Sequence, residues 1–384
     1  MASPPPPRSP PNSTDKAWYQ YLTLDLLLQV LNRTFLHPFV AWIIPLSLRA
    51  QATPYSHPAF ISTTAYAIFL TLLTAASYIN RRIAHGLPRD VELGEEVVVV
   101  AGGASGLGLL IAEFYGMRGV SVAVLDIRKE EEVGEGFQEL PAVEYYQCDV
   151  GNRSEVEAVA GRITKDLGTP TIVINCVATT INGSPLLSLP ASAITKTIQA
   201  NLLSHFHILQ TFLPGILSEE NGGTIVTVSS VIGHLSAAGL ADYAASKAAL
   251  SSVHRTLEAE LRASGDNARV KALLVETGQM ATPLFDGTET PNSFFAPILE
   301  PVKVAQEIVS AIDCGNGGVI RLPAFATWVN WYAVLPASVQ RFARYISGID
   351  TAMAKRRSAG KADERSRSSN GQSESDLELV EMED

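Results

Sequence analysis

The sequence predicts an α/β fold in which a doubly wound, mostly parallel sheet follows an N-terminal membrane-anchor helix or hairpin. Beyond Val97, short runs rich in β-branched residues alternate with helix-like stretches, a pattern typical of βαβ units. The first of these runs leads directly into a glycine-rich turn. Ahead of this region, residues 50–80 contain no Asp, Glu, Lys or Arg. These observations divide the chain into an apolar N-terminal part and a larger α/β domain.

The anchor region is expected to span residues 17–85. Its main apolar run, residues 60–79, is 20 residues long, and at about 1.5 Å per helical residue it crosses about 30 Å of hydrocarbon. Arg81 and Arg82 follow at once, so the positive-inside rule places the next segment on the cytosolic side. An earlier stretch, residues 22–48, is either an interfacial helix or the first arm of a hairpin. The alternatives are two buried core helices, or a removed segment of a soluble protein.

The α/β domain is expected to cover residues 92–322. Its predicted strands are Val97–Ala101, Val120–Asp126, Val143–Cys148, Thr171–Asn175, Thr224–Ser229 and Arg269–Val275. Residues 323–353, which follow, are amphipathic and rich in aromatic side chains. Residues 1–16 are rich in Pro and Ser, and residues 354–384 are basic first and acidic last, so both ends are expected to be disordered.

Composition excludes two classes of partner. The net charge of −10 argues against nucleic acid, because binding phosphates requires a basic surface. The three cysteines, Cys148, Cys176 and Cys314, have neither C-x-x-C nor metal-ligand spacing, so we expect reduced thiols and no metal site. Hydrophobic residues make up 46 % of the chain and its mean hydropathy is slightly positive, which together point to a membrane-associated segment.

The glycine-rich turn has the sequence GGASGLG and lies between a predicted strand and a predicted helix. Such a turn lets backbone N–H groups and the helix N-terminus approach a pyrophosphate closely. Gly102, Gly106 and Gly108 have the spacing G-x-x-x-G-x-G, which by itself is also compatible with an ordinary turn. With the polar residues that end the following strands, it predicts a Rossmann-type dinucleotide site that includes Ser105 and Leu107.

Polar residues end the next three predicted strands. Asp126 ends the second strand, where a carboxylate accepts hydrogen bonds from the adenosine ribose and repels a 2′-phosphate. NAD(H) is therefore favoured as the cofactor, although Arg128 could serve a phosphate and leaves NADP(H) open. Asp149 and Val150 close the third strand, where a carboxylate can reach the adenine amino group. Asn175 ends the fourth strand beside the cofactor crevice; the alternative for both aspartates is a strand-end cap.

A second group of residues predicts proton transfer. Tyr243 and Lys247 stand at positions i and i+4 of a helix-like stretch, so the ammonium should lie close to the phenol. A cation there favours the phenolate and lowers its pKa, as a general acid/base acting on an alcohol or carbonyl requires. Ser230 lies 13 residues before Tyr243 and can hydrogen-bond the same oxygen.

In this order, these residues resemble the short-chain dehydrogenase/reductase superfamily. The resemblance rests on GGASGLG, Asp126, CDV, Asn175, Asn201, SSVIG and YAASK, and it covers roughly residues 92–322. The Tyr-x-x-x-Lys pair preceded by Ser230 is its most specific part. Flanking sequence such as NLLSHFHILQTFLP is similar to the retinol and 17-beta-hydroxysteroid dehydrogenase branch, whose members are associated with membranes or lipid droplets and act on lipid alcohols and ketones.

The resemblance implies four catalytic residues. Asn201 would hold a proton-relay water, and Ser230 would orient the substrate oxygen. Tyr243 would transfer the proton, while Lys247 would bind the nicotinamide ribose and adjust the pKa of the tyrosine. In the cofactor site, Tyr243 and Lys247 would be joined by Gly278 and Thr282. A homodimer through the helices of Asn201 and Tyr243 is common in the family.

The chain also departs from the family pattern. Ala101 replaces a usual Thr, Cys176 and Ala178 alter the Asn-Asn-Ala-Gly run, and Thr277 replaces a Pro. Losing the second Asn should remove a hydrogen bond that braces the central sheet. A later apolar stretch, with Met280, Phe285, Phe294 and Phe295, suits either a substrate lid or ordinary loop packing.

Two hypotheses follow. The first is an NAD(H)-dependent oxidoreductase that interconverts a hydrophobic alcohol and its carbonyl. It would sit at the endoplasmic reticulum or a lipid droplet, with membrane lipid and a hydrophobic small molecule as partners and its catalytic domain facing the cytosol. The second, motivated by the altered residues after Asn175, is a membrane or lipid-droplet scaffold that keeps the fold but binds nucleotide poorly.

Overall fold

The computed structural model describes residues 22–133, 140–285, 288 and 292–353. The predictions of disorder for residues 1–16 and 354–384 lie outside these described residues, as does the start of the predicted anchor region.

Seven strands form one sheet in the order β3-β2-β1-β4-β5-β6-β7, and every neighbouring pair is parallel. The strands are β1 (Val97–Ala101), β2 (Ser121–Asp126), β3 (Val143–Gln147), β4 (Ile172–Asn175), β5 (Gly223–Ser230), β6 (Val270–Thr277) and β7 (Gly318–Leu322). The chain winds outward from β1 to β3 and then returns to the centre at β4. The predicted doubly wound parallel sheet is thus confirmed, with its switch point between β1 and β4, where such sheets bind ligands.

The seventh strand was not predicted. β7 (Gly318–Leu322) pairs with β6 from Leu273↔Gly318 to Thr277↔Leu322. Its side chains are mostly half-buried, as expected for an edge strand. Its hydrophobic run is short and follows Asn and Gly residues, so the sequence pattern of a strand is weak. Pairing with these neighbours also carries β5 to Ser230 and β6 to Thr277, which is further than their apolar runs indicated.

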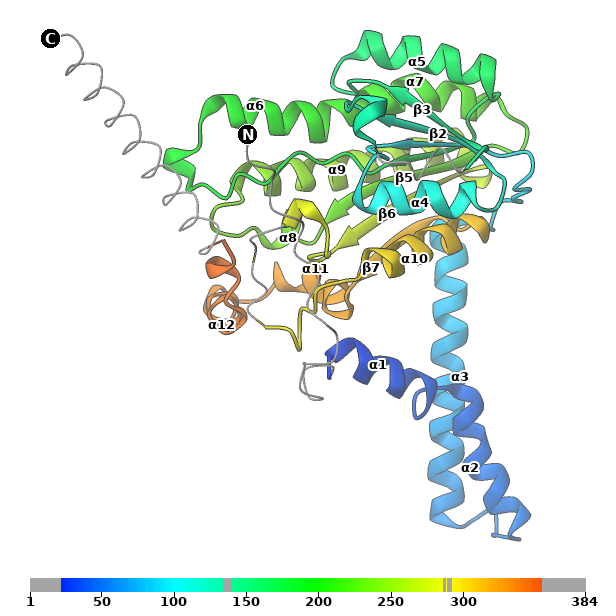
Figure 1. Cartoon of the computed structure of the whole chain (residues 1–384). Coiled ribbons are helices and arrows are strands. Elements are labelled where there is room, and N and C mark those ends of the chain that lie inside the picture. Colours follow the sequence, from blue (N-terminus) through cyan, green and yellow to red (C-terminus); the bar gives the residue numbers. More distant parts are fainter. Residues whose placement is uncertain (1–21, 134–139, 286–287, 289–291, 354–384) are drawn as a thin grey trace, which may run out of the picture.

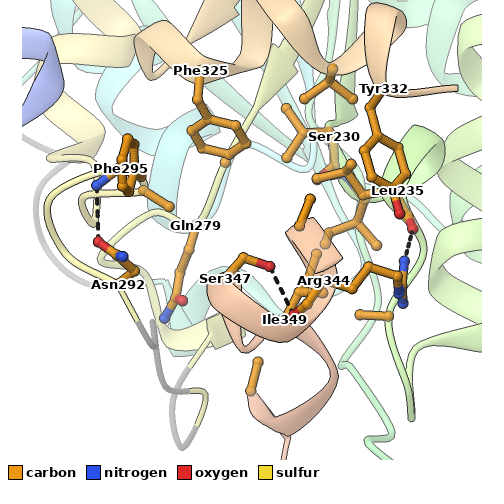
Figure 2. Close-up of a pocket in the computed structure, with 18 of the residues that line it drawn as sticks. Ser230, Leu235, Gln279, Asn292, Phe295, Phe325, Tyr332, Arg344, Ser347 and Ile349 are labelled. Carbon is orange, nitrogen blue, oxygen red and sulfur yellow. Dashed lines mark hydrogen bonds between the residues drawn. The ribbon is translucent and has the colours of Figure 1, made fainter. Parts of the chain in front are cut away.

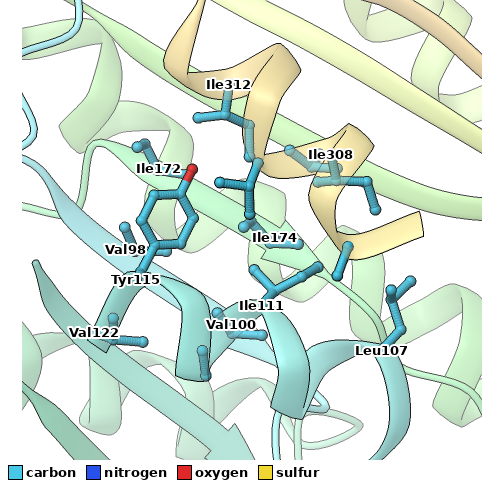
Figure 3. Packing of buried hydrophobic residues seen from close by; sticks show 14 of the residues in the cluster. Val98, Val100, Leu107, Ile111, Tyr115, Val122, Ile172, Ile174, Ile308 and Ile312 are labelled. Carbon is cyan, nitrogen blue, oxygen red and sulfur yellow. The ribbon is translucent and has the colours of Figure 1, made fainter. Parts of the chain in front are cut away.

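Helices cover both faces of the sheet (Figure 1). On one face lie α4 (Gly106–Gly116) and α10 (Pro301–Asp313), and on the other lie α5 (Arg153–Asp166), α7 (Ser204–Ser218) and α9 (Ala241–Ser264). The domain also contains α6 (Ala191–Ile198), α8 (Ile232–Leu235), α11 (Val329–Tyr332) and α12 (Ala337–Ser347). Because successive strand residues face opposite sides, the valines of β1 divide between two cores. Val98 and Val100 pack under α4 and α10 (Figure 3), and Val97 and Val99 pack under α5, α7 and α9.

Complete burial of these side chains is the main stabilising contribution. Ile111 and Tyr115 of α4 and Ile308 and Ile312 of α10 are all fully buried against the strands. Burying one such aliphatic side chain contributes about 1.5–3 kcal/mol. The sheet is therefore a rigid support for the loops that leave its carboxyl edge.

The N-terminal region forms three helices outside this body: α1 (Leu24–Arg33), α2 (Pro38–Ala50) and α3 (Pro58–His85). α2 packs beside α3, where Trp42 Nε1 donates to Thr71 Oγ1 at 3.0 Å and Tyr66 OH donates to the Phe35 carbonyl at 2.7 Å. α2 is thus the first arm of a hairpin, whereas α1 is a separate helix bent away from α2 by 45°.

α3 is long and apolar enough to cross a membrane, and only 11 % of its most apolar window is buried. That exposure excludes the alternative of a buried core helix, and the helix is compatible with a membrane anchor. The C-terminal end of α3 contacts the α/β body. Arg262 Nη2 donates to the Ala84 carbonyl at 3.2 Å, and Lys271 Nζ donates to the His85 carbonyl at 3.5 Å. Cations at a helix C-terminus are favourable, so these two contacts help to hold the end of α3 against the body.

Candidate active site

The glycine-rich turn between β1 and α4 requires glycine at two kinds of position. Gly102 and Gly106 have φ angles of 74° and 58°, in the left-handed region that favours glycine. A Cβ atom on Gly108 would lie 2.4 Å from the Gly102 carbonyl oxygen, which leaves no room for a side chain. The turn therefore brings the N-terminus of α4 close to the edge of the sheet.

A cavity of about 480 Å³ lies over this turn at the carboxyl edge of the sheet. Most of the predicted cofactor residues line it: Gly102, Ser105, Gly106, Leu107, Gly108, Asp126, Asp149, Val150, Tyr243, Lys247 and Thr282. Two do not: Asn175 lies buried at the end of β4, and Gly278 lines a neighbouring apolar cavity. A glycine cradle at one end and a carboxylate at the second strand fit a dinucleotide.

Asp126 and Arg128 meet at one end of this cavity. Asp126 accepts hydrogen bonds from the backbone N–H groups of Ala104 (3.1 Å) and Arg128 (3.3 Å). The Arg128 guanidinium lies on the glycine turn and donates to Ser105 Oγ at 3.1 Å. A carboxylate and a guanidinium thus face the same end of the cavity, and they favour different nucleotides.

Helix α9 places Tyr243 and Lys247 on the wall of the cavity. Lys247 Nζ lies 5.7 Å from the centroid of the Tyr243 ring and donates to the Val228 carbonyl at 3.0 Å. Ser230, at the end of β5, lies close enough to Tyr243 to influence its pKa, and its hydroxyl donates to the Thr277 carbonyl at 3.0 Å. These three residues, predicted from their spacing, are brought together, and Tyr243 lines the cavity.

One electrostatic expectation was wrong. Burial raises the pKa of Tyr243, and the neighbouring Ser230 hydroxyl acts in the opposite direction. Burial also lowers the pKa of Lys247 to about 8, which the nearby Cys176 opposes. Desolvation in this enclosed site disfavours both the phenolate and the ammonium, and it is the largest cause of both shifts.

An apolar cavity of about 540 Å³ adjoins the other side of Ser230. Phe295, Phe325 and Tyr332 surround the same space, and Ser347 and Ile349 of the C-terminal segment lie across from them (Figure 2). Arg344 is its one charged lining residue among those described, and its guanidinium is held by Asp350 and by the Leu235 carbonyl at 2.8 Å.

The predicted apolar stretch after β6 contributes to both cavities. Phe285 lines both of them, Phe295 lines the apolar one and Met280 lines the cofactor cavity. Phe294 is absent from both sets of lining residues. Sequence reasoning missed the part played by residues 325–353, because an amphipathic pattern shows that one face is apolar but not what that face encloses.

The comparisons agree with this geometry. A family model described as short chain dehydrogenase matches residues 96–292. Retinol dehydrogenase 10-B of Danio rerio is 32 % identical over 250 residues, 59 % of this chain and 74 % of that protein. The 17-beta-hydroxysteroid dehydrogenase 13 of Homo sapiens is 31 % identical over 266 residues, 67 % of this chain and 85 % of that protein. The chain belongs to the short-chain dehydrogenase family. The predicted resemblance is confirmed, including its similarity to the retinol and 17-beta-hydroxysteroid branch.

Asn201 of the dehydrogenase lies in η5 (Gln199–Leu203), a π-helical turn between α6 and α7. Its side chain is completely buried: Oδ1 accepts from the Thr179 N–H at 2.8 Å, and Nδ2 donates to Ser246 Oγ at 2.9 Å. Asn201 therefore ties the loop after β4 to helix α9. The water-holding role implied by the family stays a prediction, although a π-turn is a frequent feature of functional sites.

A buried hydrogen-bond chain beneath the dehydrogenase site was not predicted. Asn175 Nδ2 lies 2.8 Å from His205 Nδ1, His205 Nε2 lies 3.3 Å from Thr227 Oγ1, and His254 Nδ1 lies 2.9 Å from the same hydroxyl. The side-chain oxygen Oδ1 of Asn175 accepts from the Val177 N–H, so the side-chain NH2 group must donate to His205. The chain links β4, α7, β5 and α9, so His205 braces the central sheet at Asn175.

These histidines should make the dehydrogenase sensitive to acid. Burial lowers the pKa of His205 to about 3 and that of His254 to about 4, from an ordinary value of 6.5. At a pH between the folded-state pKa of each histidine and 6.5, the histidine is protonated in the unfolded chain but not in the folded chain. The free energy of unfolding therefore falls as the pH decreases below 6.5. The loss approaches about 1.4 kcal/mol per pH unit for each histidine. We expect the melting temperature to drop steeply between pH 6.5 and 4.5.

The substitution His205→Gln should flatten this pH dependence, because glutamine does not titrate. His207→Gln, on the same helix, is the matched control: its ring contacts the Val150 carbonyl at 3.2 Å, outside the buried chain. Thermal melts at half-unit pH steps measure the effect. The prediction would be refuted if the melting temperatures of wild type and His205→Gln fell in parallel as the pH decreases.

Proposed function

We propose that this short-chain dehydrogenase is a membrane-anchored, NAD(H)-dependent oxidoreductase that interconverts a hydrophobic alcohol and its carbonyl. The observation that carries the proposal is that Ser230 and Tyr243 lie close together, each in the lining of a different cavity. Ser230 lines the apolar cavity and Tyr243 lines the cofactor cavity, so the pair stands at the boundary of the two. A substrate oxygen at this boundary would meet both hydroxyl groups.

The chain's own residues account for the proton. The nicotinamide, when bound, supplies or accepts the hydride. Ser230 would orient the substrate oxygen by a hydrogen bond, and the Tyr243 hydroxyl would donate its proton to that oxygen during carbonyl reduction. Lys247 would stabilise the resulting phenolate from one helical turn away, where the low dielectric of a buried site strengthens the attraction. For alcohol oxidation the proton moves in reverse.

The apolar cavity supports a hydrophobic substrate. Its walls are largely aliphatic and aromatic, and its polar groups, such as Gln279 and Asn292, are few. Such a lining binds a hydrocarbon skeleton and leaves the reacting oxygen as the main polar group to be paired. The names of the relatives suggest retinoids and steroids as the first compounds to assay, since the walls do not select between them.

Membrane attachment is supported by α3 and by Arg81 and Arg82 at its end. With the basic residues on the cytosolic side, the catalytic domain would face the cytosol at the endoplasmic reticulum or a lipid droplet. A homodimer through the helices of Asn201 and Tyr243 remains a prediction of the family resemblance.

The direct experiment is a turnover screen. Full-length protein in nanodiscs is incubated with retinal, estrone and long-chain ketones, and with the matching alcohols, each with NAD(H) and NADP(H). Cofactor-dependent conversion of at least one apolar compound is expected. The scaffold alternative, favoured by the Cys176 and Ala178 replacements, predicts instead that calorimetry detects no NAD binding.

Cofactor choice gives a separate prediction. The carboxylate of Asp126 should bind the ribose hydroxyls and repel a 2′-phosphate, so NADH should bind more tightly than NADPH. Asp126→Ala is expected to lower the preference for NADH about tenfold, because a charged hydrogen-bond acceptor is lost. Arg128→Ala should change the preference in the opposite direction. Fluorescence titration gives both dissociation constants without a substrate, and an unchanged ratio in Asp126→Ala would exclude this role.

A further inference from the structure

Helix α1 belongs to the N-terminal region by sequence, yet it is bonded to the catalytic body. The Leu24 N–H donates to the Phe294 carbonyl at 2.9 Å, and Asp25 Oδ1 accepts from the Ala324 N–H at 2.7 Å across a separation of 299 residues. α1 also packs on η8 (Ala324–Trp328). In Figure 1, α1 extends from the anchor hairpin to the underside of the body.

The two partners of α1 lie in two different walls of the apolar cavity. Residues 292–297 form one wall through Phe295 and its neighbours, and η8 forms another through Phe325 and Trp328. Figure 2 shows Phe295 and Phe325 facing the same space from these two segments. One short stretch of α1 therefore holds both walls at once.

Asp25 is a charged side chain in a place that an anchor helix does not require. Within the described part of the chain, its Oδ2 atom is buried and has no hydrogen-bond partner. Burying a carboxylate oxygen without a hydrogen bond costs free energy, which other contacts of the same group must offset. The bond from the Ala324 N–H to Asp25 is the contact that reaches the cavity wall. The opposite face of α1 instead exposes apolar side chains, including Leu27 and Val30.

We propose that α1 is part of the substrate site and that Asp25 is a positioning residue for the apolar cavity. By fixing Ala324 while Leu24 fixes Phe294, it sets the separation of Phe325 from Phe295. This inference rests on the proposed function for its substrate, but the placement of the walls is independent of turnover.

The test compares Asp25→Ala with Asp25→Asn, which keeps an acceptor oxygen, and with Asp90→Ala as a matched control. The exposed Asp90 carboxylate accepts from the N–H of its neighbour Val91 at 3.1 Å, a contact within one short loop. Amide hydrogen exchange of residues 292–297 and 324–329 is measured in nanodisc-bound protein. Asp25→Ala should exchange at least about tenfold faster in these segments, the effect of losing one charge-assisted hydrogen bond. β1 and β5 should be unchanged in all variants, and Asp25→Asn should restore most of the protection.

The kinetic part uses the best apolar substrate from the turnover screen. Asp25→Ala should raise KM about tenfold with kcat and NADH affinity nearly unchanged, since the catalytic groups do not move. Unchanged exchange in both segments would overturn the inference, and so would a loss of kcat at constant KM. If wild type has no turnover but the exchange result holds, the proposed function fails while the positioning role stands.

Discussion

Replacing Tyr243 with Phe is expected to lower kcat/KM by about 10²–10⁴-fold, the usual contribution of a general acid/base. The substitution removes one hydroxyl from the boundary between the two cavities and leaves the ring in place. NADH affinity should remain within about twofold of wild type, because the glycine turn and Asp126, which are expected to bind most of the dinucleotide, are unchanged. Steady-state kinetics and calorimetry on the same preparation measure the two quantities.

Tyr115→Phe is the matched control for this substitution. Tyr115 is equally buried, but its hydroxyl bonds Asp313 in the core between α4 and α10. It should cost some stability and no activity. Wild-type turnover by Tyr243→Phe would remove Tyr243 from the chemistry, whereas equal losses in both variants would point to a folding defect.

Gly108→Ala is expected to raise the dissociation constant for NADH by roughly 10- to 100-fold, which corresponds to an overpacking penalty of about 1–3 kcal/mol. The added methyl group would meet the Gly102 carbonyl at 2.4 Å, and backbone atoms at both ends of the turn must move to relieve the clash. That movement displaces the N–H groups expected to face the pyrophosphate.

The control for Gly108→Ala is Gly161→Ala in α5, where an added Cβ meets nothing within 4 Å. This second variant should bind NADH normally and be slightly more stable, because alanine favours the helix. Normal NADH binding by Gly108→Ala would mean that the turn does not hold the cofactor.

Much of the fold could be read from local patterns. The β1–turn–α4 unit is visible in the sequence because hydrophobic period, glycine spacing and the helix that follows all agree. β7 was missed because an edge strand is half-buried and carries a weak pattern, so its existence depends on pairing with β6. The hairpin of α2 and α3 was left open because charges and prolines indicate where helices break, not which helices pair.

The site was predictable where one element fixes the spacing. Tyr243 and Lys247 share a helix, so their proximity follows from the sequence. Their pKa values did not, because desolvation depends on every element that encloses them. Contacts between distant segments, such as Asp25 with Ala324 or Asn175 with His205, have no local signature at all.

Deuterium transfer tests the central claim most directly, namely that the boundary at Tyr243 joins a bound nicotinamide to an apolar carbonyl compound. Full-length protein is given NADH deuterated at the transferable position, with retinal, estrone or a long-chain ketone, and the product is examined by mass spectrometry. Wild type should place deuterium on the carbinol carbon of at least one product, and Tyr243→Phe should form almost none. Bound NADH with no labelled product from any compound, or equal labelling by both proteins, would contradict the account.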